Sequence, residues 1–253
     1  MQHVRKVSYV RSVFVVFLCA FALAGCGGSS SSTTPATPGV TSVRFAEGAP
    51  ELETSVNGVV QPIGLNAYLQ VNAQTVESTF AYGTISPFTT LTAGTLSLTV
   101  RNTEGYAVGP LKSAALSAGK QYTLVIVGSY PSYRVLTFAE PPPSSGAQLS
   151  FYEASPTVPQ AGFGSFKASS KSDFTALGQA NLGSVATVSL GSSVADFGGY
   201  AGSPGKVIGT ITPVQLNSFD TGNALPFHSI DRLSLFLFDS NASRSPVFGS
   251  LDR

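Results

Sequence analysis

The feature that most constrains this chain is a succession of short apolar runs separated by turn residues. Thr95–Val100 alternates apolar and polar side chains, Gln121–Val127 is almost continuously apolar, and Tyr133–Phe138 is again rich in β-branched and aromatic residues. No stretch after residue 40 keeps the 3.6-residue apolar period of a helix. Turn dipeptides fill the gaps: Asn57-Gly58, Ala93-Gly94 and Ala118-Gly119. We therefore expect an all-β fold made of antiparallel sandwiches.

A proline-rich segment divides this pattern into two parts. Glu140-Pro-Pro-Pro-Ser-Ser-Gly146 fixes an extended backbone and reads as a domain boundary. The segments Val43–Pro50 and Leu149–Pro156 share an apolar-x-Phe-x-Glu-x-x-Pro spacing, which favours a duplication. The expected organisation is two tandem immunoglobulin-like sandwiches behind an export segment, with these bounds: 1–25 signal peptide, 26–39 lipidated Cys and tether, 40–140 first domain, 141–146 linker, 147–253 second, divergent domain.

The first of these parts contains a set of four motifs: the Asn-Gly turn, Phe80–Phe88, the strand led by Ala93-Gly-Thr, and Leu116-Ser-Ala-Gly-Lys-Gln-Tyr-Thr123. With these motifs it resembles a known bacterial family, the domain of unknown function 4397. The similarity covers residues 40–140, and it extends to the second part mainly through Glu153-Ala-Ser-Pro156. The resemblance implies a β-sandwich and an exported protein, and it brings no catalytic residues to transfer.

The N-terminus has the layout of an export signal. Arg5, Lys6 and Arg11 precede an apolar run, Val13–Leu23, of 11 residues, about half of the ~20 that a membrane-spanning helix needs. Leu23-Ala-Gly-Cys26 then matches the lipobox of bacterial lipoproteins. This match implies cleavage between Gly25 and Cys26 and lipidation of Cys26. An ordinary secretory signal with an incidental cysteine is the alternative.

Position and composition suggest where such a protein would work. Gly27 is not the aspartate associated with inner-membrane retention, so we expect the outer membrane, and residues 27–39 form a flexible Gly/Ser/Thr/Pro tether. The mature chain keeps no free thiol, because Cys19 is in the signal and Cys26 carries lipid. Removal of the signal leaves 11 basic and 13 acidic residues, a net charge of about −2. The cations are scattered singly, which argues against a nucleic-acid partner.

Candidate catalytic groups are few. His228 is the one histidine after the signal, and although Asp220 or Asp231 could complete a triad, no Gly-x-Ser-x-Gly elbow exists. Glu51 and Glu53, near Glu47, could share one face of a strand and act as a carboxylate pair, but solvated acids beside a turn are commoner. We expect no cofactor and no metal. Calcium ligands among Asp220, Asp239 and Asn241 stay open without a recognisable loop motif.

Binding residues are equally sparse. Four tyrosines are expected in or beside loops, where exposed rings could stack on a sugar or anchor a protein: Tyr106, Tyr130, Tyr133 and Tyr200. The glycine-rich stretch 198–205 lacks the P-loop pattern and predicts a turn or crossover. The leading hypothesis is a non-enzymatic, lipid-anchored envelope protein that binds a protein or glycan. The alternatives are a passive spacer and a cryptic esterase or glycosidase using Glu51/Glu53 or His228.

Overall fold

The computed structural model describes residues 39–167, 170–190, 195–202, 207–211, 232–240 and 246–252. Several predictions concern residues outside these ranges: the signal peptide, the lipidation site Cys26, almost all of the tether, the end of the glycine-rich stretch, and the candidate groups Asp220, His228, Asp231 and Asn241. In the described part of the chain, no helix is long and apolar enough to span a membrane.

The described chain is all-β, as the apolar pattern predicted. The first half contains these strands: β1 Val40–Glu47, β2 Glu53–Val56, β3 Val59–Pro62, β4 Tyr68–Val71, β5 Gln74–Glu77, β6 Thr89–Thr92, β7 Gly94–Arg101, β8 Ala107–Leu116, β9 Gln121–Val127 and β10 Arg134–Ala139. The second half contains these strands: β11 Gln148–Glu153, β12 Gln160–Lys167, β13 Ser170–Asn181, β14 Val185–Ser189, β15 Ala195–Ala201, β16 Val207–Ile211, β17 Arg232–Leu237 and β18 Val247–Asp252.

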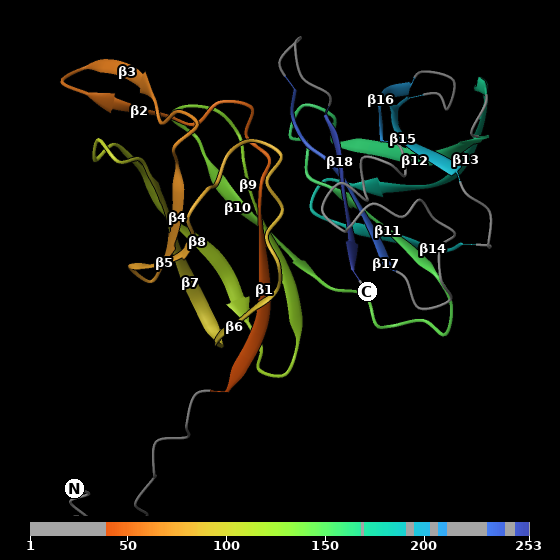
Figure 1. The fold of residues 1–253 in the computed structure, drawn as a ribbon, viewed down its shortest axis with the longest axis horizontal. Coiled ribbons are helices and arrows are strands. Elements are labelled where there is room, and N and C mark those ends of the chain that lie inside the picture. Colours follow the sequence, from red (N-terminus) through yellow and green to blue (C-terminus); the bar gives the residue numbers. More distant parts are fainter. Residues whose placement is uncertain are drawn as a thin grey trace, which may run out of the picture. The chain divides into compact units, whose positions relative to one another are not determined.

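Each half is a sandwich of two four-stranded sheets around its own core (Figure 1). In the first half the sheet orders are β10-β9-β1-β6 and β5-β4-β7-β8, and in the second β18-β17-β11-β14 and β13-β12-β15-β16. Alternation along each strand builds the cores: Phe45 of β1 and Leu98 of β7 lie in the first, and Phe151 of β11 and Phe163 of β12 in the second. Apolar side chains removed from water on two facing sheets supply most of the driving force for such a fold.

The two halves repeat one topology. Replacing β1, β4, β5, β6, β7, β8, β9 and β10 by β11 to β18 in order converts the first pair of sheets into the second. The two segments with the shared sequence spacing form the equivalent strands β1 and β11. The hairpin β2–β3 has no counterpart: the described chain passes from Glu153 to Gln160 without a strand, whereas Glu47 and Tyr68 are separated by this hairpin. The first half therefore carries an insertion at the end of its first strand.

One pairing differs from a purely antiparallel sandwich. β1 runs parallel to β9, from Ser42↔Gln121 to Glu47↔Ile126, and β11 runs parallel to β17 in the same way. The chain leaves β1, crosses to the opposite sheet and returns first as β6, which pairs with one edge of β1 in the antiparallel sense. After β7 and β8 in the opposite sheet it returns again as β9, which pairs with the other edge of β1 and runs in the same direction. Alternation along a strand predicts which face is buried but not which strand is its neighbour.

A third core cluster joins the two halves within one compact unit, Pro38–Arg253. It consists of side chains on the outer faces of the two mixed sheets: Ala46, Val125, Val127, Phe138, Tyr152, Ala154, Phe236 and Phe238. The rings of Phe138 and Tyr152 meet edge to face, with centroids 5.5 Å apart, and Tyr152 stacks on Phe236. The halves are thus held together by buried apolar surface as well as by the chain.

A buried ionic cluster lies in the same interface. Arg44 of β1 is fully buried and donates hydrogen bonds to Thr123 Oγ1 at 2.7 Å, to Tyr152 Oη at 3.0 Å and to Ser234 Oγ at 2.7 Å. Its guanidinium lies 3.3 Å from Glu140 Oε1, and Glu140 also accepts hydrogen bonds from Thr123 and Tyr152. Because Arg44 and Thr123 belong to the first half and Tyr152 and Ser234 to the second, this cluster links both.

Of the turns predicted from the sequence, the one at Asn57-Gly58 is confirmed and the one at 198–205 is wrong in part. Asn57 and Gly58 join β2 to β3 with φ values of 53° and 80°, the conformation that favours an Asn-Gly turn. The turn expected at 198–205 is wrong for its first part, because Gly198, Gly199 and Tyr200 are in β15. These glycines admit close neighbours: a Cβ on Gly198 would lie 2.9 Å from the Phe166 ring.

Candidate functional site

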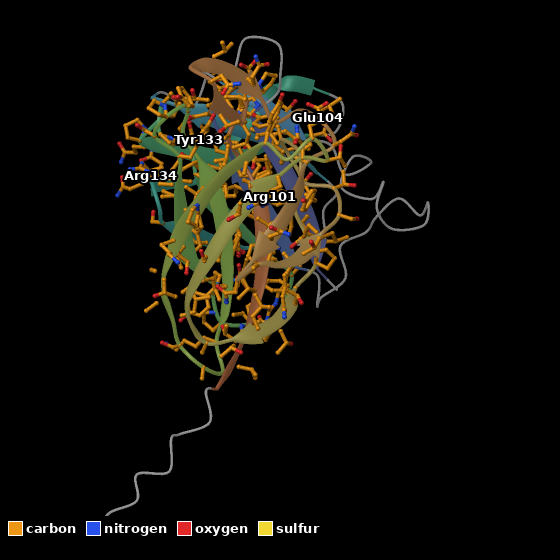
Figure 2. The ribbon with its side chains drawn as sticks, turned by 90° about the vertical axis from the view of Figure 1, so that its left-hand side faces the viewer. Arg101, Glu104, Tyr133 and Arg134 are labelled. Carbon is orange, nitrogen blue, oxygen red and sulfur yellow. The ribbon has the colours of Figure 1, made fainter. Side chains whose placement is uncertain are left out.

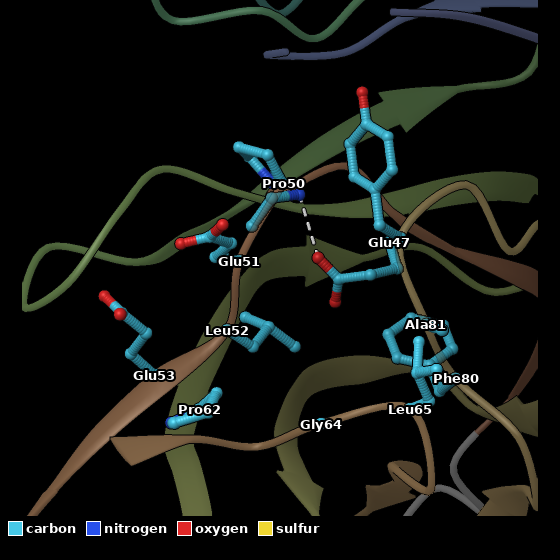
Figure 3. A pocket seen from close by; sticks show the side chains of 12 residues that line it. Glu47, Pro50, Glu51, Leu52, Glu53, Pro62, Gly64, Leu65, Phe80 and Ala81 are labelled. Carbon is cyan, nitrogen blue, oxygen red and sulfur yellow. Dashed lines mark hydrogen bonds between the residues drawn. The ribbon is translucent and has the colours of Figure 1, made fainter. Parts of the chain in front are cut away.

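A pocket of about 380 Å³ lies where β1 ends in the first half. Three segments line it: the end of β1 with the start of β2, the chain after β3 from Pro62 to Leu65, and residues 80–82. Backbone hydrogen bonds fix these segments to one another. Ile63 donates to the carbonyl of Leu52 at 2.7 Å, and Phe80 donates to that of Ala67 at 2.7 Å. The β2–β3 hairpin and its flanking residues therefore lie over the end of β1 and form one side of the pocket (Figure 3).

Glu47 contributes the most unusual group in this pocket. Alternation along β1 places it on the same face as Val43 and Phe45, so only 1% of the residue is exposed. Its Oε1 accepts a hydrogen bond from the Ala49 amide at 2.8 Å, whereas Oε2 is buried without a partner. Figure 3 shows this carboxyl group beside Leu52, with the Ala49 bond as a dashed line. Desolvation raises the pKa of Glu47 well above its usual range, opposed in part by the Ala49 bond.

Two further glutamates stand on the same wall. Glu51 is exposed and Glu53 is half-buried. Tyr133 fixes this segment, because its hydroxyl donates to the Glu51 carbonyl at 2.8 Å and accepts from the Glu53 amide at 2.8 Å. Burial raises the pKa of Tyr133 to about 12, and the negative charges of Glu53 and Glu47 add to the effect. The remaining lining is mostly apolar, with Leu52, Leu65 and Phe80 as its largest members.

The expectation for the acids is therefore wrong in part. Glu47 is a buried acid on the apolar face of a strand, and only Glu51 is the exposed acid beside a turn that the sequence suggested. Glu51 and Glu53 do line one pocket, together with Glu47. No group of three or more His, Cys, Asp or Glu side chains in the described ranges is placed to hold a metal ion.

The four tyrosines do not meet in one concave site. Tyr130 and Tyr133 line a second cavity of about 310 Å³, beside Gly109–Leu111, and Tyr106 lines a third of about 300 Å³. Tyr200 was wrongly expected in a loop: it is in β15 and only 2% exposed. Its ring covers Gly162 on the neighbouring strand and meets Phe174 edge to face, so it serves the second sandwich.

The positively charged side chains form no patch around these tyrosines. Figure 2 shows Arg101 and Arg134 at separate places on the face that carries Tyr133. Arg44 is enclosed in the interface, paired with Glu140. Arg101 and Arg134 therefore lie apart on this face, and Arg44 is not exposed beside them.

In the second half, Glu153 has the same carboxyl contacts as Glu47, but the described residues there include no hairpin equivalent to β2–β3. Glu153 Oε1 accepts from the Ser155 amide at 2.8 Å, and its Oε2 is buried without a partner. Desolvation raises the pKa of Glu153 to about 8, and the charge of Asp239 adds to it. Asp239, one of the residues for which the sequence left calcium binding open, accepts hydrogen bonds from Ser155 and Thr157 through Oδ1, which lies 2.6 Å from the Ser155 hydroxyl.

Sequence reasoning missed Glu47 and Arg44 as special residues. A signal for Glu47 was present: in both repeats the glutamate continues an apolar-x-Phe-x alternation, which places it on the core side. Arg44 carries no comparable local signal, because Thr123, Tyr152 and Ser234 are 79, 108 and 190 residues away along the chain.

Comparison with known proteins agrees with the motifs in the first half. A family model described as "Domain of unknown function (DUF4397)" matches residues 54–161, from within β2 to the start of β12. The match includes most of the inserted hairpin and the Pro62–Leu65 wall, but it begins after Glu47. A search of curated proteins found no match. The DUF4397 model therefore covers most of the first half and the start of the second, on a β-sandwich framework, which agrees with the resemblance that the turn and strand motifs indicated.

Proposed function

We propose that this chain is a lipid-anchored protein of the bacterial cell envelope whose paired β-sandwiches form a non-enzymatic binding module. The observation that carries the proposal is the pocket at the end of β1, which exists because the first half gained a hairpin that the described second half does not have. A volume of about 380 Å³ is within the range of small-ligand sites. Pockets of this kind, with apolar walls and a few polar groups, bind ligands or side chains of a partner.

The lipid anchor rests on the sequence of residues 1–26. The short apolar run, the flanking cations and the lipobox together favour thioether lipidation of Cys26 and release of residues 1–25. Several acyl chains on one residue bind a bilayer stably, at about 0.8 kcal/mol per buried methylene. The tether would hold the sandwiches near the outer membrane, and a protein or glycan of the envelope would be the partner.

The interface between the halves supports a binding role over a loose chain of modules. Arg44, Glu140 and the apolar cluster around Tyr152 hold the two sandwiches together. Tyr82, which lines the pocket, also donates a hydrogen bond to the Asp239 carbonyl of the second half at 2.6 Å. The second sandwich thus supports one wall of the pocket in the first.

Metabolic labelling with a fatty acid and membrane fractionation test the anchor. The wild-type chain should incorporate label and sediment with outer-membrane vesicles. Cys26→Ser should lose the label and accumulate as an unprocessed precursor. Continued labelling of the Cys26→Ser chain would contradict the anchor.

A hydrolase is the second candidate, because one observation favours it. A buried carboxyl group whose pKa is raised, in one pocket with the exposed Glu51, is the arrangement of a general acid paired with a base. The lining favours binding instead, because its side chains are apolar apart from the three glutamates and Tyr82.

A panel of chromogenic esters and glycosides separates the two candidates. Binding alone predicts no turnover by the wild-type protein. A glycosidase predicts turnover that is lost in both Glu47→Gln and Glu51→Gln. The passive-spacer reading predicts that pocket variants behave like wild type in cells and that only loss of the whole fold has an effect.

A further inference from the structure

We propose that the pocket at the end of β1 recognises a primary ammonium group on an apolar stem, with Glu47 Oε2 as the acceptor. This inference rests on the proposed binding function and names its ligand chemistry. It is carried by the unused acceptor, by the charge of the lining, by the apolar walls, and by the comparison of the two repeats.

Glu47 Oε2 is a buried hydrogen-bond acceptor without a partner. Buried polar atoms in folded proteins are almost always hydrogen-bonded, and an unpaired one costs roughly what a lost hydrogen bond costs. Glu47 Oε2 has no partner, although the carboxyl group is held in place by the Ala49 amide and lines the pocket. A donor from a ligand would satisfy this oxygen without any change in the Glu47–Ala49 bond.

The second argument is charge. Glu51 and Glu53 lie on the lining, and no lysine or arginine is among the described residues that line this pocket. Burial raises the pKa of Glu47, so this carboxyl group adds to the negative charge only when it has released its proton, which a bound cation favours. A cation is therefore attracted to the pocket and an anion is repelled. Tyr133 holds the backbone of the Glu51–Glu53 segment through two hydrogen bonds, so the ligand does not need to order the main chain that carries these carboxylates.

The single unpartnered oxygen of Glu47 favours an ammonium group over a guanidinium group. Arginine-like ligands bind best to a carboxylate with both oxygens open, because two parallel N–H bonds form. Here Oε1 is already engaged by Ala49, and only Oε2 has no hydrogen-bond partner. A compact ammonium needs one strong acceptor at its end. Leu52, Leu65 and Phe80 supply apolar surface for an alkyl stem.

Glu153 in the second half allows a direct comparison with Glu47 in the first. Glu153 repeats the same carboxyl geometry, with one oxygen on the Ser155 amide and the other unpartnered. The described second half has no hairpin equivalent to β2–β3 over this residue. Glu153→Gln therefore makes the same chemical change as Glu47→Gln, outside the pocket.

Isothermal titration of the full-length lipidated protein, purified in detergent micelles, tests the proposal with four probes that each contain four carbon atoms. These are butylammonium, butanol, butyramide and butyrate, each corrected for titration into empty micelles. Butylammonium should bind at least tenfold more tightly than the other three. Added salt should weaken its binding, because part of the attraction is between charges.

Two matched variants identify the acceptor. Glu47→Gln keeps the bond to Ala49 but replaces the open oxygen by a donor, so butylammonium affinity should fall at least tenfold. Glu153→Gln should leave that affinity within twofold of wild type. Thermal unfolding of both variants confirms that the fold is intact. Leu65→Ser, on an exposed wall, gives a second check, with an expected loss of about threefold in affinity.

The outcomes separate this inference from the proposed function. If butyramide or butanol binds and Glu47→Gln preserves that binding, the pocket is a ligand site and the ammonium assignment is wrong. If butylammonium binds equally well to wild type and Glu47→Gln, the acceptor assignment is overturned. If none of the four probes binds, the proposed ligand chemistry is overturned, and the proposed function loses the pocket that carries it.

Discussion

The buried arginine in the interface gives the sharpest stability prediction. Arg44→Met removes a guanidinium that is fully buried and leaves Glu140, whose side chain is only 9% exposed, without its cation. Methionine fills similar volume, so the change tests charge and hydrogen bonding more than packing. The loss also removes the cation that lies 4.9 Å from the Phe88 ring and 5.3 Å from those of Tyr152 and Phe236.

The size of the effect follows from what remains. Breaking a buried ion pair by removing one partner costs about 3–5 kcal/mol, because the other charge stays buried. Thr123 and Tyr152 still donate to Glu140 in the variant, which limits the loss. Ser234 loses its bond to Arg44. We expect the free energy of unfolding to fall by about 3–4 kcal/mol.

Urea denaturation followed by circular dichroism measures this change. Arg134→Met, at an exposed arginine, is the control and should alter the free energy of unfolding by less than about 0.5 kcal/mol. The double variant Arg44→Met/Glu140→Gln should recover about 2 kcal/mol relative to the sum of the single changes, since it removes the uncompensated charge. A loss below about 1 kcal/mol for Arg44→Met, or additive single changes, would refute the reasoning.

Two other perturbations test the second half. Between pH 4.5 and 8 the native protein holds a proton on Glu153 that the unfolded chain has released, so the free energy of unfolding falls as pH rises. In urea titrations, Glu153→Gln should reduce this fall between pH 5 and 8 by roughly 3 kcal/mol. An unchanged pH profile would contradict the raised pKa of Glu153. Gly162→Ala places a Cβ 2.1 Å from the Tyr200 ring and should lower the free energy of unfolding, measured by thermal unfolding, by about 1–3 kcal/mol. Gly146→Ala is the control and should be near neutral, because a Cβ there meets no atom within 4 Å. Equal effects of the two changes would argue against the packing of Tyr200 on Gly162.

The sequence predicted local structure well because strands and turns leave local marks. Alternation at Thr95–Val100 and the apolar run Gln121–Val127 identified β7 and β9, and Asn57-Gly58 identified the β2–β3 turn. The shared spacing of Val43–Pro50 and Leu149–Pro156 identified strands that prove topologically equivalent.

Features that depend on distant residues were not predictable in this way. The parallel pairing of β1 with β9 depends on the route of the chain between sheets, which alternation does not encode. The density of glycines at 198–199 suggested a turn, whereas these residues are in a strand packed tightly against its neighbours. Only part of the candidate site could be predicted from the sequence. Glu51 and Glu53 were identified, but the burial of Glu47 and the apolar lining of its pocket follow from tertiary packing.

The central claim is that the hairpin-lined pocket of the first half is a binding site and that its counterpart at Glu153 is not. A ¹H–¹⁵N NMR titration of the lipidated protein with butylammonium tests it most directly. Amide shifts should change and saturate together at Ala49, Leu52, Leu65 and Ala81, and should stay unchanged at Ser155 and Thr157. Shifts that appear equally around Glu153, or none at the pocket at saturating probe, would contradict the account.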